Sequence, residues 1–338
     1  MTKIEELKSK ALVMRRDDDG SQTARIEELR VGDLPRQGDT LVRVHYSSVN
    51  YKDGLAVSGK GKIIRAELPF VPGIDLVGEV VHSSSGSFDP GARVIGTGWG
   101  IGENHWGGYS QYQWVDALWL VHMPQDLEPL SAIVAGTAGL TAMLAARAIV
   151  DGGRRPADGP ILVTGATGGV GSFAVLFLSR LGYDVTASTG KETEHDYLRE
   201  LGATDVIARG ELSIGARRPL DSARWSGAVD SVGGSTLESI LSAVMRHGVV
   251  ASCGLAGGAS IETSVYPFIL RGVSLVGIDS NTCPIAARVE AWDAVARTLD
   301  TDIAGRIGHI HALADVPELS EAITTGKIRG RAIIDLNT

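Results

Sequence analysis

The sequence contains few cysteines and no apolar leader at its N-terminus. Its 338 residues include two cysteines, Cys253 and Cys283, without Cys-x-x-Cys spacing. This excludes a four-cysteine zinc lobe and argues against the disulfide framework of a secreted protein. The first ten residues, MTKIEELKSK, are charged and lack the apolar segment of a secretion signal. We therefore expect a cytoplasmic protein.

Positive charge is also in deficit. The chain has 32 Lys and Arg against 40 Asp and Glu, a formal net charge of -8, which does not favour a nucleic-acid partner. The most membrane-like stretch, 129–146, carries no charge, but AGTAG interrupts it and it is rich in Ala, Gly and Thr. Spanning a bilayer takes about 20 strongly apolar residues. We predict two packed helices there and no membrane partner.

The length predicts two domains, and the residue pattern changes near residue 126. Before it, short runs of β-branched and aromatic residues between Gly, Pro, Asp and Ser are typical of an antiparallel barrel or sandwich. After residue 160, strands and helices alternate, which predicts a doubly wound parallel sheet. The closing strand, 330–336, has no partner in that sheet, so we expect the chain to return to the β-rich part. Expected strands of the parallel sheet lie at 161–165, 184–188, 205–208, 227–232, 249–254 and 274–278, and expected helices at 169–181, 192–202 and 235–248.

A glycine turn, GATGGVG at 165–171, follows the first of these strands and opens an amphipathic helix. Missing side chains let backbone N–H groups and the helix N-terminus approach a pyrophosphate. The turn fits A-x-G-x-x-G and also the T-G-x-x-x-G-x-G of short-chain dehydrogenases. That second family needs a Tyr-x-x-x-Lys, which the chain lacks. The residues expected to contact a dinucleotide here are Thr167, Gly168, Gly169 and Val170.

An acidic residue is missing where NAD-binding proteins hold the ribose, roughly 20 residues further on. That position is occupied by Ser188, Thr189, Gly190 and Lys191. Without a carboxylate, a 2′-phosphate meets no like-charge repulsion, and the hydroxyls and the ammonium can bind it. Arg209, just past the third strand, is expected over the same pocket. We predict NADP(H) as cofactor and place Glu192 in the first turn of the next helix, where an acid is favourable.

Zinc ligands are missing as well. Ile74 and Asp75 stand where zinc-dependent medium-chain alcohol dehydrogenases carry His and Glu, and no cysteine precedes Cys253. Catalytic zinc takes three protein ligands. We therefore predict no metal site, and we expect His105 to be a pocket residue that contacts substrate.

Seven segments together resemble one family. They are SSVNYKDGLAVSGKGKIIR, PFVPGIDLVGEV, GTGWGIGENHWGGYSQ, GTAGLTAML, VTGATGGVGS, CGLAGG and PFILRGVSLVGIDS. Over nearly its whole length the chain resembles the zinc-independent quinone-oxidoreductase branch of the medium-chain dehydrogenase/reductase superfamily, and within it the acrylyl-CoA reductase group. The NYKD and GENHWGG segments are the specific parts, since the glycine turn alone indicates only the superfamily.

The resemblance implies a GroES-like catalytic domain at 1–132 and 306–338 and a Rossmann domain at 133–305. It implies NADPH-dependent reduction of the C=C bond of an acyl-CoA substrate, acrylyl-CoA to propionyl-CoA, without metal and usually by a homodimer. In such proteins the cofactor lies in the cleft. The further cofactor contacts that we expect are Tyr51, Thr137, Leu255, Ile269, Ser280 and Arg331.

This reaction needs donors at the thioester oxygen and a proton for the α-carbon. The candidate catalytic residues are Asn50, Tyr51, Lys52 and Asp53. We expect Tyr51 to donate the proton, with Lys52 favouring its loss. We expect Asn50 to donate to the enolate and Asp53 to orient Lys52. The competing hypothesis is that Tyr51 only packs on the nicotinamide and water supplies the proton.

A short basic run, SGKGKIIR, follows NYKD and includes Lys60, Lys62 and Arg65. CoA carries phosphates, so we predict that this run binds its nucleotide end; the alternative is a solvated loop. Two other functions stay open at this point. One is an NADPH-dependent quinone or general enone reductase on the same scaffold, and the other is a non-catalytic NADPH-binding protein.

Overall fold

The computed structural model describes residues 2–212, 215 and 218–337. The chain forms two compact units, Met1–Thr137 with Asn281–Thr338, and Ala138–Ser280. The predicted domain boundaries are 132/133 and 305/306, whereas the two compact units divide at 137/138 and 280/281. The second unit ends after the last strand of its sheet, and the following helix belongs to the first unit, where Arg288 donates hydrogen bonds to Thr97. That the predicted segments fold as domains stays a prediction.

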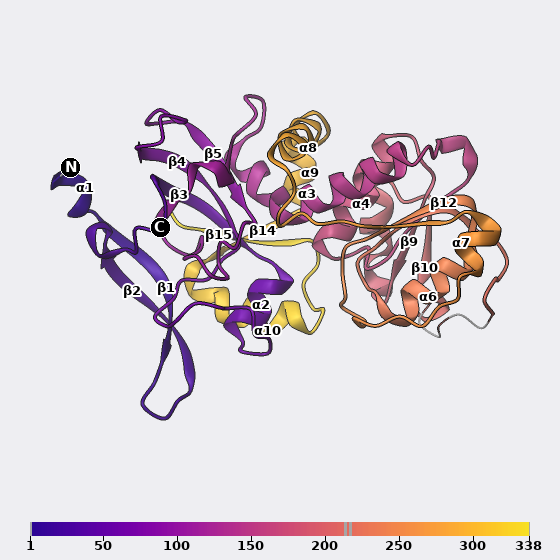
Figure 1. The fold of residues 1–338 in the computed structure, drawn as a ribbon, viewed down its shortest axis with the longest axis horizontal. Coiled ribbons are helices and arrows are strands. Elements are labelled where there is room, and N and C mark those ends of the chain that lie inside the picture. The colour runs from indigo at the N-terminus through magenta and orange to yellow at the C-terminus, as the bar shows by residue number, and fades with distance from the viewer. Residues whose placement is uncertain (1, 213–214, 216–217, 338) are drawn as a thin grey trace. The chain divides into compact units, whose positions relative to one another are not determined.

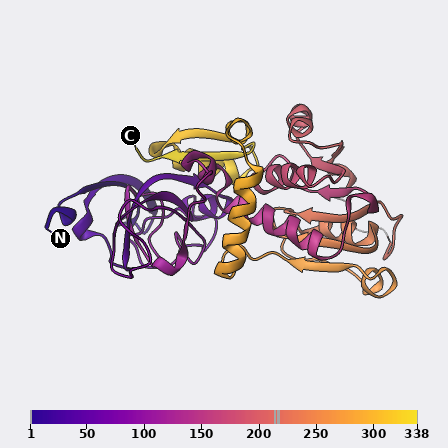
Figure 2. The same cartoon turned by 90° about the horizontal axis from the view of Figure 1, so that it is seen from above.

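The first unit is built on a seven-stranded sheet with the order β14-β15-β3-β4-β5-β7, and β6 pairs with β3 (Figure 1). Its strands are β3 (Thr40–Val49), β4 (Asp75–Ser83), β5 (Arg93–Thr97), β6 (Tyr112–Val115), β7 (Leu120–His122), β14 (Gly308–Ala312) and β15 (Arg331–Asp335). The closing strand β15 pairs antiparallel with β3. This confirms the prediction that the chain returns to its β-rich part, and Figure 2 shows the indigo N-terminal and yellow C-terminal segments in this unit.

A hairpin of β1 (Lys8–Arg16) and β2 (Gln22–Arg30) and several helices complete the first unit. The helices are α1 (Thr2–Glu5), α2 (Tyr51–Val57), α8 (Ile285–Thr298), α9 (Thr301–Ile307) and α10 (Val316–Thr324), with short 3-10 turns at Val31–Asp33, Ala117–Trp119 and Leu313–Asp315. Apolar residues of the strands, such as Leu41 and Leu76, are completely buried. Their burial is the main force that holds this sheet in one register.

The second unit is a six-stranded parallel sheet with the order β10-β9-β8-β11-β12-β13. The strands are β8 (Ile161–Val163), β9 (Val185–Thr189), β10 (Asp205–Ala208), β11 (Trp225–Asp230), β12 (Val244–Ser252) and β13 (Ser274–Gly277). The connecting helices are α4 (Gly169–Arg180), α5 (His195–Glu200), α6 (Gly234–Ala243) and α7 (Tyr266–Arg271). The strand order reverses between β8 and β11, and ligands of such sheets bind beyond the carboxyl ends of the strands at this point. The predicted doubly wound sheet is confirmed.

One local prediction needs correction. The helix expected at 235–248 ends at Ala243, because Val244 pairs with Trp225 and already belongs to β12. The two helices expected around 129–150 are confirmed: α3 (Pro129–Asp151) consists of two helical segments that meet at a kink at Gly136, where φ is 49° and ψ is -151°. Among the described residues this helix alone is long and apolar enough to cross a membrane, and 72% of its apolar window is buried inside the protein. Burial to that extent is typical of a core helix.

Candidate functional site

The glycine turn lies at the carboxyl end of β8, as predicted. Gly165 has a φ of 59°, and a Cβ on Gly171 would lie 2.3 Å from the Gly165 carbonyl oxygen. Only glycine therefore allows α4 to start so close to the strand. The N-cap of α4 is Gly168, which offers no side-chain hydrogen bond to the first N–H groups of the helix. The turn leaves these donors to a ligand, and its geometry fits a dinucleotide pyrophosphate.

The segment Ser188 to Lys191 ends β9 beside the same turn. Ser188 and Thr189 are 3% and 4% exposed, and the Thr189 hydroxyl lies 3.3 Å from that of Thr167. The Lys191 N–H donates to the Thr189 Oγ1. A Cβ on Gly190 would lie 3.1 Å from the Arg209 guanidinium carbon. The structure thus brings Arg209 to this segment, as expected.

An open pocket of about 520 Å³ lies at this end of β9 and β10. Its lining consists of Thr189, Gly190, Glu192, His195, Ala208, Arg209 and Gly210. Glu192 begins the short 3-10 helix η4 (Glu192–Glu194), so its placement in a first turn is confirmed. Its presence in the pocket lining, and that of His195, were not predicted. The 3-10 turn Glu192–Glu194 brings both residues into one lining with Thr189 and Gly190, which spacing alone does not reveal.

The NYKD segment forms the start of α2. Asn50 is its N-cap, and the Asp53 carboxylate accepts hydrogen bonds from the Asn50 N–H at 2.9 Å and from the Ile74 N–H at 2.9 Å. Burial raises the pKa of Asp53 to about 7, although these N–H donors oppose the shift. Tyr51 begins the helix and is 39% exposed. Among these residues, Asp53 has a capping geometry and Tyr51 is accessible.

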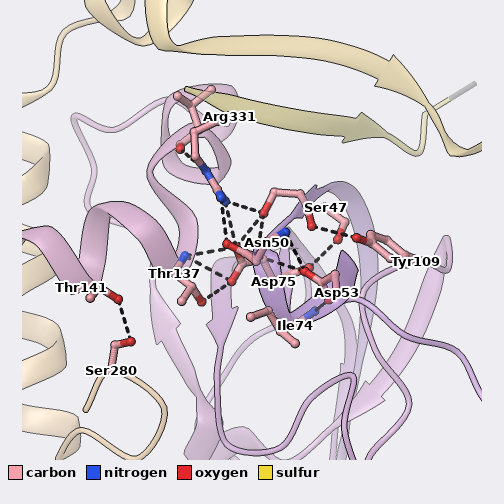
Figure 3. A network of polar contacts seen from close by, with 12 residues as sticks. Ser47, Asn50, Asp53, Ile74, Asp75, Tyr109, Thr137, Thr141, Ser280 and Arg331 are labelled. Atoms are coloured by element: carbon pink, nitrogen blue, oxygen red, sulfur yellow. Dashed lines mark hydrogen bonds and ion pairs between the residues drawn. The ribbon is translucent and has the colours of Figure 1, made fainter. Parts of the chain in front are cut away.

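A buried ionic network surrounds Asp75, the residue that follows Ile74 (Figure 3). Arg331 forms an ion pair with Asp75, with 3.2 Å between Nη2 and Oδ2, and the two residues are 3% and 0% exposed. The Asp75 carboxylate also accepts hydrogen bonds from Ser48, Asn50 and Thr137. In the sequence, Asp75 stands out only because it replaces the Glu of zinc-dependent relatives. The one signal for a buried network was a carboxylate at the start of an apolar strand.

Three of the predicted site residues take part in this network. The Asn50 amide nitrogen donates to Asp75 at 2.9 Å, and its oxygen accepts from Arg331 at 2.8 Å. The Thr137 N–H and hydroxyl both donate to Asp75. Burial lowers the pKa of Arg331, and the nearby Asp75 opposes that shift. In this structure Asn50, Thr137 and Arg331 bind one another through Asp75, and the contacts expected of them with enolate or cofactor stay predictions.

Lys52 has a different partner from the one predicted. Its ammonium lies 2.8 Å from Oε1 of Glu103, whereas both oxygens of Asp53 face the N–H groups described above. Glu103 is 5% exposed, and its second oxygen lies 3.9 Å from Arg65. The Arg65 N–H also donates to the Glu103 carbonyl at 2.8 Å. The GENHWGG loop thus lies against NYKD and the end of the basic run, and Glu103 joins them.

The other predicted substrate and cofactor residues lie as follows. His105 is buried, and its two ring nitrogens face the Trp106 and Gln37 carbonyls at 2.8 Å and 3.1 Å. Lys60 pairs with Glu321 of α10, and Lys62 is exposed. Leu255 and Ile269 are 58% and 68% exposed. The Ser280 hydroxyl accepts a hydrogen bond from that of Thr141 at 2.7 Å.

The residues do not fit a zinc site. In the described part of the chain, no group of three His, Cys, Asp or Glu side chains is placed to hold a metal ion. Ile74 provides no ligand atom, and the oxygens of Asp75 accept hydrogen bonds from Ser48, Asn50 and Thr137 while one faces Arg331.

Two family models match the chain, the alcohol dehydrogenase GroES-like domain over residues 36–125 and the zinc-binding dehydrogenase model over residues 169–299. The acrylyl-CoA reductase AcuI of Ruegeria pomeroyi is 47% identical over 328 residues, which cover 97% of this chain and 99% of that protein. The yhdH oxidoreductase of Salmonella enterica, solved in complex with NADP, has a TM-score of 0.94 at 44% identity and covers 97% of this chain and 100% of its own. The yhfP protein of Bacillus subtilis, solved with NAD bound, has a TM-score of 0.93 at 42% identity and covers 98% and 100%. This chain belongs to the medium-chain dehydrogenase/reductase superfamily.

Proposed function

We propose that the protein reduces the C=C bond of α,β-unsaturated CoA thioesters with NADPH, and that it converts acrylyl-CoA to propionyl-CoA. The main support for this proposal is the 47% identity to an acrylyl-CoA reductase over 97% of this chain. That span includes both the NYKD helix and the GENHWGG loop, which Glu103 joins through Lys52.

The support for cofactor binding comes from residues of the second unit. A Cβ on Gly171 would lie 2.3 Å from the Gly165 carbonyl oxygen, so glycine lets α4 start close to the turn, and the first N–H groups of this helix are left to a pyrophosphate. Ser188, Thr189 and Lys191 provide donors without an acid at the end of β9, and Arg209 lies over Gly190 and supports a 2′-phosphate. When bound, NADPH supplies the hydride that reaches the β-carbon.

In the first unit, we assign two tasks to α2. Lys52 has one hydrogen-bond donor engaged by Glu103 and presents the rest of its ammonium to the charge that develops on the thioester oxygen. Tyr51, which is accessible at the start of the helix, donates the proton to the α-carbon. Tyr51→Phe is expected to lower kcat by about 100-fold or more. An unchanged kcat would assign the proton to water.

Spectrophotometry with several substrate pairs tests the function directly. The oxidation of NADPH and of NADH is followed with acrylyl-CoA, crotonyl-CoA and a benzoquinone. We expect the highest kcat/KM with NADPH and acrylyl-CoA. Activity with the quinone alone would overturn the proposed substrate, and a preference for NADH would overturn the proposed cofactor.

A quinone or general enone reductase is the second candidate. The observation in its favour is that a relative of Bacillus subtilis named as a quinone oxidoreductase, YhfP, is 44% identical over 312 residues. The same assay separates the two, because a CoA ester and a quinone are offered to one enzyme preparation.

We further propose that the active form is a cytoplasmic homodimer. Within the described residues, strand β13 pairs only with β12 in the sheet, so its other edge has open hydrogen-bonding groups. Leu275 on this strand is 38% exposed, and the preceding segment exposes Val265, Tyr266, Ile269 and Leu270. A second copy of the chain covers such an edge by antiparallel pairing about a two-fold axis. Light scattering during gel filtration tests this, and Leu275→Asp is expected to produce the monomer.

A further inference from the structure

Three side chains with ionic or titratable groups line one pocket without binding one another. Glu192, His195 and Arg209 border the pocket at the ends of β9 and β10. Within the described chain, none of these three side chains forms a hydrogen bond or ion pair with another residue. This differs from the surrounding surface, where neighbouring charges pair, as Arg199 does with Asp196 at 3.0 Å. Side chains left without a protein partner around a hollow are available to a ligand.

Glu192 is out of place in a pocket for a 2′-phosphate alone. Arg209 in the same lining provides the expected positive charge, but a carboxylate repels a phosphate group at short range. The same carboxylate is the group that accepts hydrogen bonds from the ribose hydroxyls of a cofactor that lacks the phosphate. The pocket therefore contains one determinant for each form of the cofactor.

We propose that Glu192 is a selectivity-determining residue that keeps NADH as a usable second cofactor and limits the preference for NADPH. This inference rests on the proposed dinucleotide function. Arg209 provides the attraction for the 2′-phosphate, and His195 provides a further ring N–H donor at the wall. Glu192 offsets part of this attraction and binds the free 2′-hydroxyl of NADH.

The test measures binding rather than turnover. Dissociation constants for NADPH and NADH are determined by calorimetry for the native protein and for Glu192→Gln. An exposed charge of this kind contributes up to about 1 kcal/mol, or about fivefold in affinity. We expect Glu192→Gln to bind NADPH about threefold more tightly and NADH no more tightly, so that the selectivity ratio rises. The gain should shrink at high salt.

Asp184→Asn is the matched control. Asp184 is exposed and directly precedes β9. The substitution therefore removes one negative charge at the opposite end of the same strand. We expect it to leave the ratio of the two dissociation constants unchanged. An unchanged ratio in Glu192→Gln, or an equal change in Asp184→Asn, would overturn the proposal.

The fragments 2′,5′-ADP and 5′-AMP separate this result from the proposed function. They carry the adenine end without the nicotinamide, and the same change in their ratio would place the effect at the ribose. If the native protein binds NADPH tightly but Glu192→Gln leaves both ratios unchanged, the role of Glu192 fails and the proposed cofactor stands. If the native protein binds neither dinucleotide, the proposed function fails with it.

Discussion

The surroundings of Asp75 and the pocket beside Arg209 differ in whether their charged side chains are paired within the protein. Around Asp75, an acid and an arginine that are both almost completely buried bind each other and their polar neighbours. Around Arg209, exposed groups of both signs line a hollow and leave one another unpaired. A buried charge must find its partner within the protein, because the cost of leaving it alone is large. An exposed charge is stabilised by water, so it needs no partner within the protein and can bind a ligand.

This difference separates architecture from binding. Residues whose polar atoms are all engaged, such as Asn50 and Arg331, hold strands β3, β4 and β15 together at one place. Residues with free polar atoms, such as those that line the pocket, are available to a ligand. The following experiments test that division, beginning with the largest expected effect.

The first prediction concerns stability. Arg331→Met leaves the Asp75 carboxylate buried without its cation, and we expect the free energy of unfolding to fall by about 3–5 kcal/mol. Arg209→Met removes an exposed arginine, and we expect a change within about 0.5 kcal/mol. Urea denaturation measures both. Similar losses in the two variants would show that the two regions do not differ in this respect.

The second prediction concerns pH. The pKa of Asp53 is raised to about 7 by burial, well above its ordinary value of 3.8. The folded protein then retains a proton that the unfolded chain releases, so stability falls as pH rises toward about 7 and levels off above it. We expect a loss of at most about 4 kcal/mol across this window. In Asp53→Asn the pH dependence should be flatter, and an identical slope in both proteins would contradict the assignment.

The third prediction concerns the cofactor. Arg209→Ala removes a charged hydrogen-bond donor from the pocket, which is worth about 1.5–3 kcal/mol. We expect the dissociation constant of NADPH to rise by about tenfold or more, while that of NADH hardly changes. Fluorescence titration with each dinucleotide measures this. Equal weakening of both would mean that Arg209 does not contact the 2′-phosphate.

The smallest expected effect concerns the basic run. Lys62→Ala and Arg65→Ala are each expected to raise the KM for CoA esters by about threefold and to leave that for small enones unchanged. Lys60→Ala is the comparison, because the Lys60 ammonium already pairs with Glu321. Equal changes for both kinds of substrate would indicate a solvated loop.

Features that depend on neighbouring residues were predictable from the sequence. The glycine turn, the segment Ser188–Lys191 and the parallel strands each have a local pattern, and the structure has them where expected. Partners distant in the chain were not predictable. Lys52 was paired in the prediction with its neighbour Asp53, but its partner Glu103 is 51 positions away. The partner of Asp75, Arg331, is 256 positions away, and no local pattern indicates such a contact.

The return of β15 to the first sheet has a consequence for synthesis on the ribosome. The unit Ala138–Ser280 is continuous in the chain, so all its strands are present once residue 280 has emerged. The first unit begins earlier in the chain but lacks β15, and with it Arg331, until residue 331 has been synthesised. Asp75 therefore lacks its cation until Arg331 has been synthesised. The segment made first is the one whose folding is completed last, and a nascent chain stalled before residue 331 should contain a structured second unit beside an unfinished first one.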